Sequence, residues 1–488
     1  MAMQTQTTTP TEQTTSQPDA ESADWVPTWQ LRARFAVRLS ELYGGEVPAY
    51  NTLVEVSTEV NQRVMDAQGE QAERLGAIDR VTAERHGAIR VGSPEEMSQV
   101  ARIFGALGMY PTGFYDLRDA HPQPIPVVST AFRPSDRDEL ARNPFRVFTS
   151  MLVPQDRRFF DEDLERRLVE FIDNRTLFPA EVLALADRAE ADGGLGEEDA
   201  AHFLEVAGRC FELSTEPVDR AWYDELAAIS GVAADIGGVT STHINHLTPR
   251  VLDIEDLYTS MQQRGIEMIS EIQGPPGWQG PDVLLRQTSF RALAEDRAFR
   301  DSDGTISTGQ LRVRFGEVEQ RGIALTPAGR TLYDELVAEA DRRLAEKLEA
   351  GEQTTRVEVA GQVWAENLPV DELDWARRDL AYFTFRVNPD RPDGDAPSDL
   401  SPLLDGGWVL ADPIVYEDFL PRSAAGIFNS NLTDAGQMDQ SQDGIERDQN
   451  WLAEVIGRPI ATPESLYDAQ RAASLAAVAA ELGVEKIS

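Results

Sequence analysis

Two of the five histidines in this chain of 488 residues stand at the start of similar short segments. His86 begins the segment His-Gly-Ala-Ile-Arg-Val, and His246 begins the segment His-Leu-Thr-Pro-Arg-Val. Histidine is the commonest protein ligand for metals, and two histidines in matching contexts favour a shared site over two unrelated structural roles. We therefore predict that His86 and His246 bind one metal ion.

A carboxylate that could complete this site lies in the segment Phe-Gly-Glu-Val-Glu-Gln-Arg-Gly, residues 315–322. The two-residue period of a β-strand places Glu317 and Glu319 on the same face, so either could be the ligand. We favour Glu317, because alignment of the two similar regions places it opposite Ser150. Two imidazoles and one carboxylate form the facial triad of non-haem Fe(II) oxygenases, which leaves positions open for substrate and O2.

His243 competes with His246, since the two stand three residues apart in the segment Thr-His-Ile-Asn-His. In a strand their side chains would point to opposite faces. Only His246 has a counterpart, His86, in the other similar region. We therefore interpret His243 as a catalytic residue that contacts a ligand or the substrate. His121 and His202 have no such context, and we expect structural or exposed roles for them.

The similar regions extend into an internal repeat. Each copy opens with a strand at its histidine, continues with an acidic N-cap and an amphipathic helix, and ends with strand-like segments. The last segments match when Phe148 is aligned with Phe315. We predict an α+β fold in which two βαβββ modules, residues 85–154 and 239–328, form a half-open barrel around the metal.

The remaining segments are expected to surround these modules. Residues 1–24 are rich in Thr, Gln, Ser and Pro, which predicts a disordered tail. Apolar residues at helical spacing predict an N-terminal helical segment, 25–84, and a large helical insertion, 155–238. Residues 329–488 are predicted to be helical and irregular, and to close the site.

Charge and composition limit the possible partners. The chain has 84 acidic and 45 basic residues, a formal net charge of −39, so it would repel nucleic acid. It has no run of 18 or more apolar residues and no signal-like N-terminus, so we expect neither membrane insertion nor secretion. The single cysteine, Cys210, cannot form an internal disulfide. We expect a soluble, cytoplasmic protein, and leave its oligomeric state open.

The order of these motifs resembles the 2-oxoadipate dioxygenase/decarboxylase family, within the vicinal oxygen chelate superfamily. The resemblance runs from about residue 25 to the C-terminus and includes the segment Phe-Leu-Pro-Arg-Ser-Ala-Ala-Gly-Ile-Phe, residues 419–428. The block Glu-Val-Glu-Gln-Arg also looks like the ligand strand of hydroxyphenylpyruvate dioxygenases, which favours Glu317 over Glu319.

This resemblance implies an Fe(II) enzyme of lysine catabolism that converts 2-oxoadipate and O2 to 2-hydroxyglutarate with loss of two CO2. Arg90 matches the family's arginine four residues after the first histidine, and would bind a substrate carboxylate through a bidentate fork. Arg422 and Ser423 would bind substrate on the other side of the pocket. Arg422 stands where family members often have an aliphatic residue, which leaves the preferred chain length of the 2-oxo acid open.

Two other functions remain possible at this stage. A glyoxalase-like or extradiol-type enzyme of the same superfamily would have the same triad and another substrate. A non-catalytic binding protein of the same fold would need no metal. The complete set of two histidines and one glutamate favours an enzyme.

Overall fold

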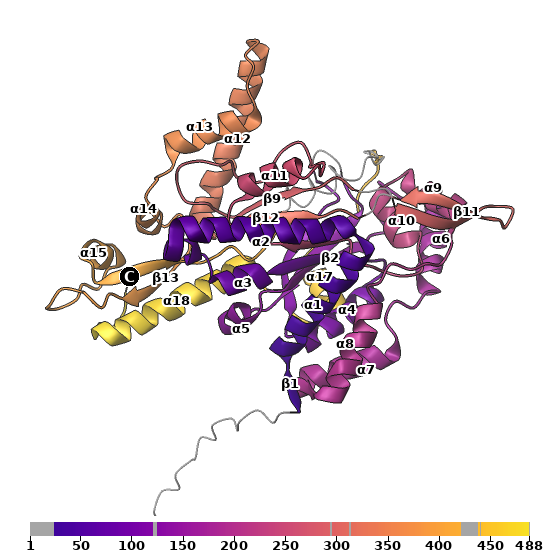
Figure 1. The fold of residues 1–488 in the computed structure, drawn as a ribbon, viewed down its shortest axis with the longest axis horizontal. Coiled ribbons are helices and arrows are strands. Elements are labelled where there is room, and N and C mark those ends of the chain that lie inside the picture. Colours follow the sequence, from indigo (N-terminus) through magenta and orange to yellow (C-terminus); the bar gives the residue numbers. More distant parts are fainter. Residues whose placement is uncertain are drawn as a thin grey trace, which may run out of the picture.

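The computed structural model of the protein describes residues 24–120, 124–292, 295–311, 314–420, 438–439 and 441–487. The predicted N-terminal tail, apart from Asp24, lies outside these residues. The described chain combines many helices with several small sheets (Figure 1). None of the helices in this part of the chain has the length and apolar character needed to cross a membrane.

The largest sheet among the described residues has five strands in the order β3-β4-β5-β2-β8. Its strands are β2 Arg85–Val91, β3 Tyr110–Asp116, β4 Val127–Arg133, β5 Arg146–Leu152 and β8 His246–Pro249. β2 and β5 are parallel, and all other neighbours are antiparallel. Helix α4 (Pro94–Ala106) follows β2, and its N-cap Ser93 accepts a hydrogen bond from the backbone of Glu96, as predicted from the acidic N-cap region.

A second group of elements follows β8 in a similar order. It consists of α11 Ile254–Gln263 and the antiparallel pair β9 Leu285–Ser289 and β12 Glu317–Arg321. Single bridges extend this pair, with Met268 opposite Phe290 on one side and Arg250 parallel to Glu319 on the other. β2 therefore lies parallel to β5, the last strand of its group, and a parallel bridge joins the end of β8 to β12, the last strand of the second group.

The register of the last strand differs from the predicted one. Arg90 on β2 pairs with Ser150, whereas Arg250, which follows β8, pairs with Glu319. The position of Ser150 therefore corresponds to Glu319, and the predicted alignment with Glu317 is wrong by two residues. A shift of two residues keeps each side chain on its own side of the strand, so this error leaves Glu317 facing the site.

Alternate residues of β2 face two different cores. Ile89 and Val91 pack with the N-terminal helices, while Ala88 belongs to a cluster that includes Phe148 of β5. Because side chains alternate along a strand, His86 and Arg90 lie on the side of Ala88. This face is the one on which the candidate site is built.

Helices and short strands cover these sheets. The N-terminal and inserted elements are β1 Trp25–Pro27, α1 Thr28–Glu46, α2 Pro48–Gln68, η1 Gly69–Glu73, α3 Ile78–Ala83, α5 Arg137–Arg142, α6 Glu162–Asp173, α7 Ala180–Asp192, β6 Gly194–Gly196, α8 Glu197–Arg209, β7 Val218–Asp219, α9 Arg220–Ala227 and α10 Gly231–Gly237. The strands β10 Glu295–Arg300 and β11 Ile306–Leu311 form a hairpin that pairs with β7.

The C-terminal region forms a body with its own core, which also includes Leu285 and Ile323. Its elements are α12 Pro327–Glu349, α13 Arg356–Asn367, α14 Glu372–Arg377, β13 Phe383–Val387, α15 Leu400–Asp405, β14 Val409–Pro413 and α18 Pro463–Leu482, whereas α17 Gln449–Ile456 packs on α4 and joins the core of the N-terminal helices. Helices α12 and α13 project from this body, and α18 packs against β13 (Figure 1). The segment after β14 returns to the central sheet and reaches the candidate site.

Candidate metal centre

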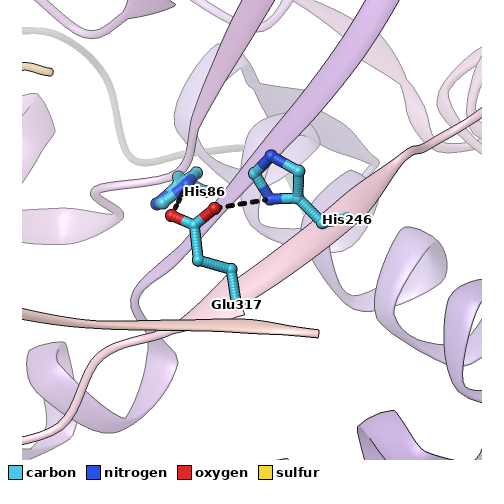
Figure 2. Close-up of side chains that lie close together, drawn as sticks. All are labelled: His86, His246 and Glu317. Carbon is cyan, nitrogen blue, oxygen red and sulfur yellow. Dashed lines mark ion pairs between the residues drawn. The ribbon is translucent and has the colours of Figure 1, made fainter. Parts of the chain in front are cut away.

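His86, His246 and Glu317 meet at the face of the central sheet, each from a different strand (Figure 2). One possible ligand atom from each residue lies within 4.8 Å of the others, and all three side chains are buried. The Nε2 atom of His86 is 3.3 Å from Oε1 of Glu317, and Nδ1 of His246 is 3.7 Å from Oε2 of the same carboxylate. The three predicted ligands are thus brought together.

Strand pairing explains this convergence. Residue Ala88 of β2 lies opposite His246 in the antiparallel β2-β8 pair, which brings the two imidazoles to within 5.4 Å between ring centroids. β12 runs beside the end of β8 through the bridge between Arg250 and Glu319. Glu317 then reaches between the two rings.

The electrostatics of this group favour a bound cation. Burial raises the pKa of Glu317 above its usual value, and burial together with nearby His86 holds the pKa of His246 well below its usual range. Burial also lowers the pKa of His86, but Glu319 and Glu317 outweigh it and raise that pKa. The site therefore contains a neutral imidazole and a carboxylate whose charge is poorly solvated, which a divalent cation would stabilise.

The donor set also fits a particular class of metal. Imidazole nitrogen and carboxylate oxygen suit Fe(II) and similar divalent ions, and three protein ligands on one side leave positions open for other molecules. The Nδ1 atom of His86, on the other side of the ring from Glu317, lies 2.8 Å from Oε2 of Glu319. Glu319, the alternative ligand in the sequence, is therefore placed behind the triad.

Apolar rings enclose the triad. Phe419 meets the ring of His86 edge-on with 5.0 Å between centroids, and Phe315 stacks on His246 at 5.3 Å. The side-chain amide of Gln287 donates to Glu317, and Oγ1 of Thr248 is 3.1 Å from Nδ1 of His246. These contacts hold the ligand side chains in place.

A second buried polar group lies further along the same face of β2. Arg90 forms an ion pair with Asp235 of α10, and Nδ2 of Asn245 donates to the same carboxylate at 3.0 Å. Nε2 of His243 is 3.5 Å from Oδ1 of Asp235. Burial lowers the pKa of His243 to about 4, although Asp235 opposes this, so the ring is neutral at pH 7.

Comparison with known proteins identifies the family. A family model described as 2-oxoadipate dioxygenase/decarboxylase matches residues 35–431. The chain belongs to this family. Curated members of that name from Mycobacterium tuberculosis (strain ATCC 25618 / H37Rv) and Pseudomonas putida are 54% and 39% identical, and the alignments cover 91% and 94% of this chain and 96% and 98% of those proteins.

Solved structures of related proteins have the same fold as this chain. The crystal structure of the hydroxyglutarate synthase in complex with 2-oxoadipate from Pseudomonas putida matches with a TM-score of 0.80 and 35% identity, and the match covers 95% of this chain and all of that one. Another match, the YdcJ protein from Shigella flexneri, has a TM-score of 0.77 and 34% identity over 92% of this chain.

For three residues considered in the sequence analysis, the structure gives no position. Arg422, Ser423 and His121 lie outside the described residues. The remaining histidine, His202, lies on α8 at the surface, where its Nε2 is 2.6 Å from Oε1 of Glu181. This agrees with the exposed role expected for it.

Several residues that lie at the site in the structure could not be identified from the sequence. Asp235 lies 145 positions from Arg90, and Gln287 lies 30 positions from Glu317. Neither stands in a motif or at a repeated position that could have identified it. In the sequence Phe419 is only the first residue of the segment that resembles the family, and its contact with His86 depends on the fold of the C-terminal region.

Proposed function

We propose that this chain is an Fe(II)-dependent dioxygenase/decarboxylase that converts 2-oxoadipate and O2 to 2-hydroxyglutarate. The observation that carries the proposal is the convergence of His86, His246 and Glu317 in a member of a family named for this reaction. A relative with the same fold was solved with 2-oxoadipate bound. The substrate, 2-oxoadipate, is the basis for proposing a role in lysine degradation.

The number of CO2 molecules released in each turnover follows from counting carbon atoms. 2-Oxoadipate has six carbons and 2-hydroxyglutarate has five, so one CO2 leaves for each turnover. The same balance accounts for oxygen, because both atoms of O2 are distributed between the hydroxy acid and CO2. The loss of two CO2 expected from the resemblance is therefore wrong for this product.

The protein's part in the reaction begins with the ligands. His86, His246 and Glu317 would hold Fe(II), which, when bound, supplies the redox chemistry that lets a 2-oxo acid react with O2. Phe315 and Phe419 pack against the two imidazoles and keep water from this side of the site. The buried position also strengthens the attraction between the carboxylate and a cation.

Arg90 is proposed to bind a carboxylate of the substrate. It lies on the same face of β2 as His86, and a dianionic substrate needs a fixed cation in a protein with a net charge of −39. Asp235 pairs with the guanidinium and would hold it in place. His243, neutral and beside Asp235, is proposed as the catalytic residue that offers the substrate a hydrogen bond without adding charge.

Arg422 and Ser423 are proposed to bind the other end of the substrate. Phe419 contacts His86, and Arg422 follows three residues later in the chain. This short distance in sequence supports a position near the triad. A cation at that place would favour a second carboxylate, which a 2-oxo dicarboxylic acid provides.

We also propose that residues 85–154 and 239–328 are two copies of one βαβββ module that form a half-open barrel around the metal. The shared order of elements and the joining pair β2-β8 support this. The other units would be the helical segments 25–84 and 155–238 and the C-terminal region 329–488, which closes the site. A cytoplasmic location remains part of the proposal.

The test is turnover by protein loaded anaerobically with Fe(II). We expect 2-oxoadipate to cause O2 uptake, with one CO2 and one 2-hydroxyglutarate formed for each O2. 2-Oxoglutarate and 2-oxopimelate serve as chain-length controls and report on the role of Arg422. Iron-loaded protein that takes up no O2 with any of these acids would overturn the proposal, and activity only on a thiol adduct or a catechol would favour the glyoxalase-like or extradiol alternative.

A further inference from the structure

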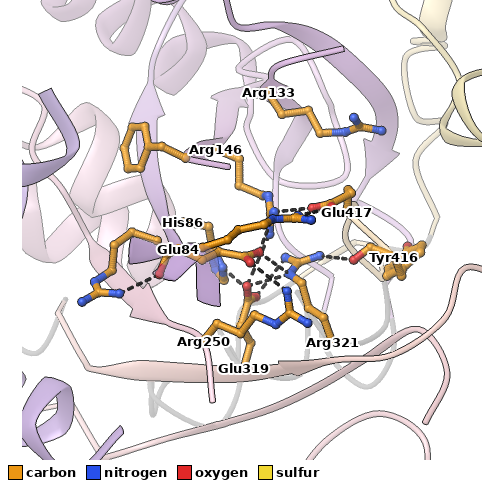
Figure 3. Close-up of polar contacts among 12 residues, drawn as sticks. Glu84, His86, Arg133, Arg146, Arg250, Glu319, Arg321, Tyr416 and Glu417 are labelled. Atoms are coloured by element: carbon orange, nitrogen blue, oxygen red, sulfur yellow. Dashed lines mark hydrogen bonds and ion pairs between the residues drawn. The ribbon is translucent and has the colours of Figure 1, made fainter. Parts of the chain in front are cut away.

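Behind the triad lies a buried cluster of charged side chains (Figure 3). Its carboxylates and guanidinium groups come from segments that are far apart in the chain: Glu84, Arg146, Arg250, Glu319, Arg321 and Glu417. Burying so many charges is costly and is weak evidence for stability alone. The contacts of one member, Glu319, point to a more specific role.

Glu319 connects this cluster to a metal ligand. One of its oxygens, Oε2, lies 2.8 Å from Nδ1 of His86, and its side chain has no exposed surface. The opposite nitrogen of the same ring, Nε2, faces Glu317. A carboxylate this close to Nδ1 favours the tautomer that has its proton on that nitrogen, and this tautomer leaves the lone pair of Nε2 directed at the metal position.

Arg321 holds Glu319 in this orientation. Its Nε and Nη2 atoms donate to the two carboxylate oxygens at 2.7 and 2.9 Å, which is the planar fork that fixes both the position and the rotation of a carboxylate. Nη1 of Arg146 makes a longer contact of 3.4 Å to Oε1. Both arginines are fully buried, so the geometry is not averaged by solvent.

The same guanidinium also fixes the other neighbour of the His86 ring. Nη1 of Arg321 donates to the backbone carbonyls of Tyr416 and Asp418 at 2.8 and 3.1 Å, which anchors the segment that carries Phe419. Phe419 in turn packs edge-on against His86. Arg321 therefore sets two of the contacts that determine how this imidazole is turned.

We propose that Glu319, held by Arg321, is a positioning residue that orients His86 and fixes its tautomer for metal binding. The inference rests on the proposed metal centre and adds to it a residue that does not itself bind the metal. It also changes the meaning of a Glu319→Gln variant, which from the sequence alone would serve as a control for Glu317.

Glutamine at position 319 is a sharp test because an amide has only one oxygen. The oxygen can accept from Arg321 or from His86, and the NH2 group must then face the other donor. Either choice costs a contact, and an NH2 group directed at Nδ1 would favour the tautomer whose proton blocks Nε2. We expect the Kd for Fe(II) to rise by roughly 10–100-fold, the usual effect of losing such a partner.

The matched control is Glu84→Gln. It removes the same charge from the same buried cluster, since Glu84 contacts Arg146 at 2.7 Å and Arg250 at 2.9 Å. Its contact with Arg321 is longer, at 3.5 Å, and it has no described contact with His86. Both variants should lower the Tm of the metal-free protein. Only Glu319→Gln should reduce the additional rise in Tm that saturating Fe(II) causes under anaerobic conditions, and only it should lose iron faster to a chelator.

Glu319→Asp covers the case in which Glu319→Gln does not fold. Aspartate keeps the charge beside Arg321 but withdraws the carboxylate from His86, so iron should again be lost faster than in the parent. Equal rates of iron loss in the Glu84 and Glu319 variants, or a parental rate in Glu319→Asp, would overturn the positioning role while the parent still binds iron. A parent that takes up no Fe(II) would instead overturn the proposed metal centre itself.

Discussion

Replacing His246 with alanine, and separately His243 with alanine, decides which of two neighbouring histidines binds the metal. Both side chains are nearly inaccessible, with 5% and 4% of their surface exposed, so the two substitutions remove similar volumes from similar surroundings. His246 lies with His86 and Glu317 in the triad. His243 instead contacts Asn245 and Asp235. The pair therefore provides its own control.

The expected effect on metal binding follows from the number of ligands. Structural zinc sites with four ligands bind with about 10–16 kcal/mol, or about 2.5–4 kcal/mol per ligand, so losing one of three ligands here should weaken binding on the order of 10²–10³-fold. Each alanine should also destabilise the metal-free fold, on the order of 2–4 kcal/mol, because it leaves a cavity. That second effect is shared by both variants.

Iron content after mild chelation separates the two effects. We expect His246→Ala to lose nearly all iron while His243→Ala keeps it, with comparable losses in the Tm of the two metal-free proteins. His243→Ala should still be impaired in turnover if it contacts the substrate. Retention of iron in His246→Ala together with its loss in His243→Ala would show that the triad has been assigned to the wrong histidine.

Three further predictions concern other sites. Arg90→Ala should retain iron but show a KM for 2-oxoadipate raised tenfold or more, because a charge-assisted hydrogen bond contributes about 1.5–3 kcal/mol, and Arg90→Lys should recover only part of the loss in steady-state assays. Asp418→Asn should lower the free energy of unfolding in urea by about 3–5 kcal/mol, since it leaves the fully buried Arg133 without its bidentate carboxylate partner. Burial raises the pKa of Cys210 to about 11, so alkylation of the native protein by iodoacetamide should be slow at pH 8 and rise about tenfold per pH unit below 11, whereas a fast reaction at pH 8 would contradict that pKa.

The three residues of the triad could be predicted from the sequence because the evidence for them is local. His86 and His246 occur in similar short segments, and Glu317 stands in a short polar strand next to a glycine. Strand alternation then places the correct side chains on one face whatever the exact pairing. The helices after each histidine could be predicted for the same reason, since an acidic N-cap region and apolar residues at helical spacing are visible in a few residues.

The same periodicity explains the error in register. A pattern with a period of two is unchanged when one copy slides by two residues, so apolar alternation could not decide whether Ser150 corresponds to Glu317 or Glu319. The predicted alignment rests on matching Phe148 with Phe315. In the structure the bridge between Arg250 and Glu319 sets the register, and that bridge depends on how β8 and β12 meet in space.

The contacts behind the site depend on the whole fold, and no short segment predicts them. Arg146 and Glu417 are 271 positions apart, and Arg133 and Asp418 are 285 apart, yet both pairs are buried. The composition agrees with these buried arginine–carboxylate contacts in one respect, because only two of the 45 basic residues are lysines. A lysine in such surroundings would lose its proton readily, whereas a guanidinium stays charged and can bind both oxygens of a carboxylate. The fork between Arg321 and Glu319 requires that geometry, so the preference for arginine is consistent with a buried cluster that orients a metal ligand.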